Sequence, residues 1–79
     1  MSRGYELKNK EVININTAER IGYVSDVEFG EDSGTIEALV VPRRGGLWSK
    51  LTGTEVIIPW ELIEVVGKDV ILVRMFETL

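Results

Sequence analysis

The stretch that decides the fold runs from residue 21 to residue 41 and reads IGYVSDVEFGEDSGTIEALVV. Over 21–29, mostly apolar side chains occupy alternate positions, which predicts a single strand with one face toward water. Residues 30–34 contain two glycines that can adopt positive φ and an Asp-Ser pair that can bond backbone amides, so a hairpin turn is expected there. The chain then returns as a second strand over 35–41.

The alternation within the returning strand predicts which side chains face the core. The expected core residues are Ile36, Ala38 and Val40. Leu39 and Val41 fall on the alternate positions, which begin with the polar Thr35 and Glu37. We therefore expect Leu39 and Val41 to form an exposed apolar pair.

The rest of the chain also favours short strands. Strands are expected over 11–15, over 55–58 before Pro59, and over 69–75 after a tight turn at Gly67 and Lys68. No window of eleven or more residues shows the helical repeat, and β-branched residues fill every candidate strand. The sequence thus predicts an all-β domain of five to six short strands with at most one short helical turn. A closed antiparallel barrel is favoured over a sandwich, because closure removes two sheet edges.

Composition limits the chain further. With 79 residues it forms one small domain, 1–79, and its net charge of −4 opposes a general nucleic-acid coat. It has no cysteine and no histidine, which excludes disulfides and thiolate metal sites and fits a reducing compartment. Its longest apolar run is too short for a membrane span or a signal peptide. We expect a soluble, cytoplasmic protein without a transmembrane segment.

Gly22, Val24 and Asp26 place a glycine, a β-branched residue and an acidic residue at alternate positions of one segment. Further segments in order along the chain are 10–14, 36–42, 57–63 and 70–74. Together these segments resemble the strands of the PRC-barrel family. The length and the order of these segments are most similar to the stand-alone YlmC/YmxH type of spore-forming bacteria. The resemblance implies a small, non-catalytic barrel that binds other macromolecules, and in this type a sporulation-associated protein of unassigned activity.

Two positions depart from the resemblance. Asn9 and Ala18 stand where these proteins usually have glycine. Asparagine tolerates a left-handed backbone, whereas Ala18 would be strained by about 1 kcal/mol if positive φ were required there.

The segment 43–53 carries the strongest functional signal. Within it, 43–51 contains three of the nine basic residues, no acid, a tryptophan and two leucines. Tryptophan flanked by arginine is enriched where protein interfaces lose water, so we expect a protein-binding loop. The expected partner-binding residues are Arg43, Arg44, Leu47, Trp48, Lys50 and Leu51 in the loop, together with Leu39 and Val41.

Other interpretations of this loop remain open. Its apolar residues could instead cover an open barrel end or pack on a twin subunit, which would make the chain a homodimeric structural subunit. A weak RNA- or ribosome-associated adaptor is a further alternative. Three cations neutralise about three phosphates, so the affinity for single-stranded RNA would fall roughly twentyfold between 50 and 200 mM salt. That affinity would already be low at the lower salt concentration. Nucleic acid is therefore the least favoured partner.

Enzyme chemistry has little support in the sequence. The serines have no histidine to activate them, and no phosphate-binding glycine motif or calcium-loop order is present. We expect no catalytic residue, cofactor or metal. Asp26 is expected to cap a turn or to accept a backbone amide from a neighbouring loop, and Trp60 to plug a barrel end.

Overall fold

The computed structural model describes residues 4–42 and 55–76, with side chains from Glu6 onward. The predicted partner-binding loop 43–53 lies outside these residues. The elements are α1 (Gly4–Leu7), β1 (Glu11–Asn14), β2 (Glu19–Tyr23), β3 (Asp26–Phe29), β4 (Ile36–Pro42), β5 (Glu55–Pro59), the 3₁₀ turn η1 (Trp60–Leu62), β6 (Ile63–Val66) and β7 (Val70–Val73).

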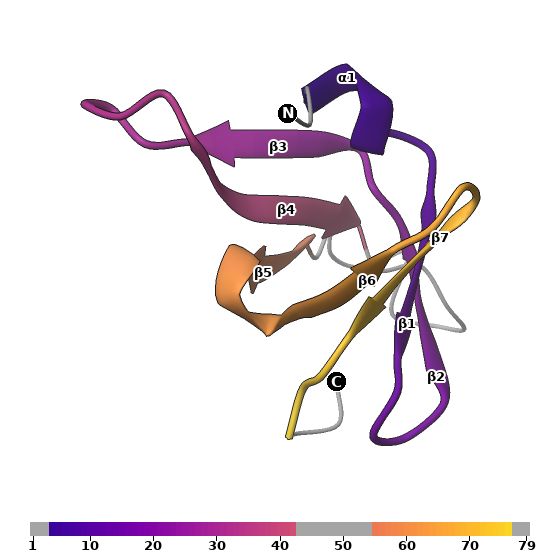
Figure 1. The fold of residues 1–79 in the computed structure, drawn as a ribbon. Helices are drawn as coiled ribbons and strands as arrows, with labels where there is room; N and C mark the ends of the chain where they lie inside the picture. Colours follow the sequence, from indigo (N-terminus) through magenta and orange to yellow (C-terminus); the bar gives the residue numbers. More distant parts are fainter. Residues whose placement is uncertain (1–3, 43–54, 77–79) are drawn as a thin grey trace.

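The described strands form two sheets that share one core (Figure 1). One sheet has four strands in the order β2-β1-β7-β6, and the other has three in the order β3-β4-β5. The all-β prediction is confirmed, with seven strands rather than five or six and two short helical segments rather than one. The purely antiparallel arrangement is wrong, because β1 and β7 pair in parallel. No strand pairing joins the two sheets within the described residues, so a closed barrel is not confirmed.

The strand predicted over 21–29 is two strands in different sheets. β2 ends at Tyr23 and β3 begins at Asp26, and the chain changes sheet between them (Figure 1). Val24 is buried in the core, while the backbone N–H and the Oγ of Ser25 donate to the carbonyl oxygen of Val40 at 2.9 and 3.2 Å. Ile21 and Val27 are buried as the alternation predicts, but Tyr23 and Phe29 are exposed, and the β1–β2 and β3–β4 ladders shift register beside them.

Both faces of the returning strand are buried towards its end, and Ala38 and Val40 are buried as predicted. Leu39 and Val41, expected to be exposed, are 0% exposed and belong to the core cluster. Glu37 shares their alternate positions but lies nearer the β3–β4 hairpin, which projects from the body of the molecule (Figure 1). The polar side chain at 37 therefore reflects the exposed start of β4 and not the face of the whole strand.

The predicted turns are confirmed. In the 30–34 hairpin, Gly30 N–H donates to the Thr35 carbonyl at 2.8 Å, and Gly34 has φ +69°. Gly67 N–H donates to the Val70 carbonyl at 2.7 Å and closes the β6–β7 turn. Asn9 and Ala18 both have positive φ, 69° and 62°, so alanine occupies a left-handed position that glycine would fill without strain.

The core lies between the two sheets, where inward side chains of both meet. α1 adds Leu7 to it, and Trp60 and Leu62 from η1 pack against it half-buried. Trp60 thus packs on the core as expected, although the described residues do not form a closed barrel for it to plug. The buried cluster comprises Leu7, Val12, Ile21, Val24, Val27, Leu39, Val41, Val56, Ile58, Ile71 and Val73.

Candidate functional site

The predicted partner-binding residues have two different outcomes. Leu39 and Val41 are buried and so cannot be part of a contact surface. The other six, Arg43, Arg44, Leu47, Trp48, Lys50 and Leu51, lie outside the described residues. The structure does show where their loop begins and returns, because Pro42 and Glu55 are paired neighbours in the β4–β5 ladder. Both ends of the 43–54 connection are therefore fixed at one end of the three-stranded sheet.

A cleft of about 440 Å³ lies beside Pro42. It is lined by six consecutive residues, Arg20 to Ser25, which cover most of β2 and the two residues after it. Asn9, Glu11 and Pro42 complete the lining. Its volume reaches the roughly 300 Å³ of a small-molecule pocket. However, it follows a strand and does not enclose convergent catalytic groups: the Ser25 Oγ already donates to a backbone carbonyl, and Arg20 Nε lies 3.7 Å from Glu11 Oε2. The cleft suits a polypeptide contact better than a reaction.

The outward side of the four-stranded sheet carries apolar side chains that are half-buried in its middle, at Ile13 and Leu72, and exposed towards its sides. Residues paired across a ladder point to the same face, so the burial of Val12, Ile71 and Val73 assigns their neighbours to the opposite side. Tyr23 is 60% exposed on this side and Val65 is 51% exposed. We call this side the outer face; it comprises Glu11, Ile13, Ile15, Arg20, Tyr23, Glu64, Val65, Val70, Leu72 and Arg74.

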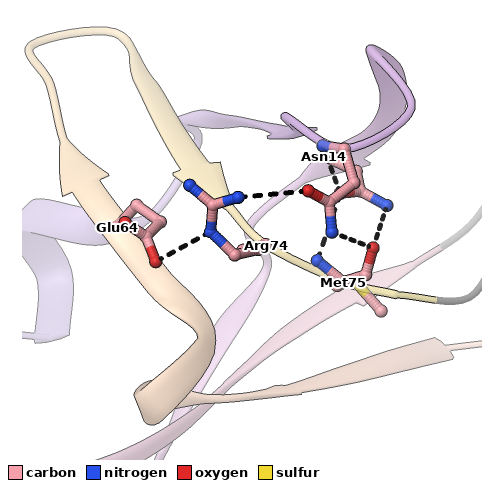
Figure 2. Close-up of polar contacts among 5 residues, drawn as sticks. Asn14, Glu64, Arg74 and Met75 are labelled. Carbon is pink, nitrogen blue, oxygen red and sulfur yellow. Dashed lines mark hydrogen bonds and ion pairs between the residues drawn. The ribbon is translucent and has the colours of Figure 1, made fainter.

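Two ion pairs lie on opposite sides of the outer face. The Arg20–Glu11 pair is on the β2 side, and Arg74 Nε donates to Glu64 Oε2 at 3.2 Å on the β6 side (Figure 2). These four side chains balance in charge, whereas the whole chain has a net charge of −4. The outer face is thus an apolar strip bordered by two cations and two anions, whose charges cancel, in an acidic protein.

A buried amide fixes the strand end that carries Arg74. The Asn14 Oδ1 accepts the Met75 N–H and the Asn16 N–H, both at 3.1 Å, and its Nδ2 donates to the Met75 carbonyl at 3.2 Å (Figure 2). Asn16 bonds the same Met75 carbonyl, and its Oδ1 accepts from Arg74 Nη1 at 3.3 Å. The guanidinium of Arg74 is therefore held between Glu64 and Asn16.

Asp26, expected to have a structural role, makes an ordinary backbone contact. The Asp26 Oδ1 accepts the N–H of Val27 at 2.8 Å, so this carboxylate bonds the amide of the next residue in β3 and not one from a neighbouring loop. Across residues 4–42 and 55–76, no three His, Cys, Asp or Glu side chains come together as a metal site.

Sequence reasoning missed the outer face because it missed β6. The alternation predicts no strand over 63–66, yet the adjacent Gly67-Lys68 turn and the expected strand after it are the signal of a hairpin. Pairing that hairpin would have placed Val65 beside Leu72. The parallel contact that adds Ile13 to the same surface has no local signature in the sequence.

In the part of the chain that the structure describes, no helix has the length and apolar character needed to cross a membrane.

Comparison with known proteins identifies the relatives of this fold. The chain is 33% identical over 75 residues to the probable sporulation protein YlmC of Bacillus subtilis (strain 168), covering 91% of this chain and 90% of that protein. It is 34% identical over 74 residues to the uncharacterized protein YmxH of the same strain, covering 91% and 87%. An uncharacterized protein of Clostridium acetobutylicum is 35% identical over 70 residues, covering 86% and 78%. The PRC-barrel domain matches residues 1–79, and the chain therefore belongs to the PRC-barrel family.

Proposed function

We propose that this chain is a non-catalytic interaction module that docks another cytoplasmic protein through its 43–53 loop. The observation that carries the proposal is the pairing of Pro42 with Glu55, which anchors both ends of the loop on one sheet. Binding residues are commonly presented by loops held on a rigid scaffold. Here the loop carries Trp48 among three cations, a composition typical of interface anchors.

The neighbourhood of the anchored ends supports a polypeptide partner. The cleft beside Pro42 runs along β2 and offers the exposed ring of Tyr23 together with the side chains of Glu11 and Arg20. A partner held by Trp48 would meet this mixed surface next to the loop ends. The similarity to the probable sporulation protein YlmC leads us to propose a role in sporulation as well.

Affinity capture from a lysate of sporulating cells tests the proposal. The baits are the wild-type chain, Trp48→Ala, and the matched control Phe76→Ala, which removes an aromatic ring that is 84% exposed and outside the loop. We expect a protein to be retained by the wild type and by Phe76→Ala and to be lost with Trp48→Ala. Thermal melting of the three baits should coincide.

Two results would contradict this function. If Trp48→Ala lowers the melting temperature strongly, the indole is part of the core and not a contact residue. If Trp48→Ala and the wild type retain the same proteins, the loop is not the docking site.

A further inference from the structure

We propose that the outer face of the four-stranded sheet binds a second copy of this chain in a weak, two-fold symmetric dimer. This inference does not depend on the 43–53 loop. It rests on the order of residues across the sheet, on their exposure and on the placement of four charges.

The register of the ladders sets one row of side chains across all four strands. Arg20 on β2 pairs with Ile13 on β1, Ile13 with Leu72 on β7, and Leu72 with Val65 on β6. The row has a cation at one end and apolar side chains in its middle and at its other end. Glu64, the neighbour of Val65, adds an anion beside that end.

The dimer has a two-fold axis that is parallel to the strands and lies between β1 and β7. Rotation about this axis places the same row of a second copy against the first, in the opposite strand order. Such an axis places Ile13 of one copy over Leu72 of the other, and the β2 side of each copy over the β6 side of the other. Sheets packed face to face keep their strands within about 30° of alignment, so this superposition is compatible with sheet twist. Arg20 of each copy then lies near Glu64 of its partner.

Both charged groups can make that contact without losing the ones they have. The Arg20 side chain is 78% exposed and its Nε lies 3.7 Å from Glu11 Oε2, so a guanidinium with five N–H donors has further donors to offer a partner. In Glu64, Oε2 accepts from Arg74, and a carboxylate can accept a second guanidinium on its other oxygen. The dimer would thus add two Arg20–Glu64 pairs around an apolar centre.

The charge of the whole chain favours this face over others. Two copies with a net charge of −4 each repel one another on average. The outer face carries no net charge, so two copies can approach there without that penalty. Its side chains are fewer than the roughly 20–30 a side of a standard interface, so we expect a dissociation constant of roughly 10–100 µM.

The outer edge of β6, the last strand of its sheet among the described residues, is a poorer contact for a second copy. The β6–β7 ladder is irregular between Ile63 and Val65, and the N–H of Ile63 already bonds the Trp60 carbonyl. A short edge strand with a β-bulge pairs poorly with a further strand. The second copy is therefore expected on the face and not at this edge.

Sedimentation equilibrium from about 5 µM to about 1 mM, with charge-reversal variants of the full chain, tests the dimer. Arg20→Glu alone and Glu64→Arg alone should each raise the dissociation constant about tenfold or more, because the symmetry turns two attractive contacts into two repulsive ones. The double variant Arg20→Glu/Glu64→Arg should bind itself more tightly than either single variant, because the contacts between copies are attractive again, although like charges then face Glu11 and Arg74 within each copy. An equimolar mixture of the two single variants should form a heterodimer. The glutamate introduced by Arg20→Glu on one copy attracts the arginine introduced by Glu64→Arg on the other, and the native Arg20–Glu64 pair remains at the second contact.

Matched controls make the same charge changes away from the face. Lys68→Glu, in the β6–β7 turn, matches Arg20→Glu, and Glu31→Arg, in the β3–β4 hairpin, matches Glu64→Arg. Both should leave the dissociation constant within about twofold, and circular dichroism melting should show all variants folded. A chain that stays monomeric at the highest concentration overturns the proposal. A dimer that the Arg20 and Glu64 variants affect no more than the controls also overturns it.

Discussion

At the scale of single residues, Asn14 shows what one buried amide does in a small apolar core. It is 0% exposed, and among the described residues it is the polar side chain in the buried set. Its three hydrogen bonds satisfy the amide itself, the Asn16 N–H and both backbone groups of Met75. A buried polar group without partners is costly, so this side chain holds the end of β7 in place by satisfying groups that would otherwise lack partners.

The first prediction concerns this amide. Asn14→Ala should lower the free energy of unfolding by about 2–4 kcal/mol, because it leaves the Met75 N–H without its partner and adds a small cavity. Asn16→Ala should cost less than about 1 kcal/mol, since its bonds are exposed and water replaces them. Urea denaturation of both variants measures the difference. Equal losses would show that Asn14 does not anchor the strand end.

At the scale of elements, β2 and β4 lie close together where the two sheets meet. Gly22 has φ +151°, and a Cβ added there would lie 2.9 Å from the Pro42 carbonyl oxygen and 3.0 Å from Val41 Cγ1. Glycine is needed here for two separate reasons, the backbone conformation and the close approach of another strand. Gly34 also has positive φ, but a Cβ added to it would meet nothing within 4 Å.

This pair of glycines gives the second prediction. Gly34→Ala should destabilise the chain by about 1 kcal/mol through conformation alone. Gly22→Ala should cost about 3 kcal/mol or more, because it combines that strain with a clash against backbone that cannot move freely. Thermal and urea unfolding of the two variants separates the effects. Similar losses in both would mean that the two sheets separate easily at this point.

Local patterns explain which elements were predictable. The hairpin over 30–34 and the turn at Gly67 depend on neighbouring residues, and both predictions are confirmed. The break at Ser25 and the inward turn of Leu39 depend on the other sheet, which no short window contains. Alternation predicts a strand at each place, but the face of a strand follows from what packs on it. Sequence patterns therefore predict strand positions better than strand environments.

At the scale of the whole molecule, the sequence predicts the class of fold but not its surface. The resemblance to the PRC-barrel family is confirmed over residues 1–79. The outer face, in contrast, joins β1 and β7 from opposite ends of the chain, with Glu11 beside Val70. A contact between such distant segments leaves no periodic signal in either one. The candidate surface consequently becomes visible only with the strand order.

The same parallel contact makes the last strand structurally central, and the third prediction concerns it. β7 lies between β1 and β6, and its Ile71 and Val73 are fully buried. Removing residues 69–79 takes away the β1–β7 and β6–β7 ladders and two core side chains. The burial of each of these two side chains contributes about 1.5–3 kcal/mol. A domain of this size has roughly 5–15 kcal/mol of stability in total.

The shortened chain, 1–68, should therefore lose cooperative thermal unfolding by circular dichroism and the dispersed amide signals of a folded protein. Adding a synthetic peptide of residues 69–79 should restore both, since the peptide supplies the missing strand between its two partners. Cooperative melting of 1–68 by itself, near the temperature of the full chain, would show that β7 is peripheral and that the parallel pairing does not hold the two ends of the chain together.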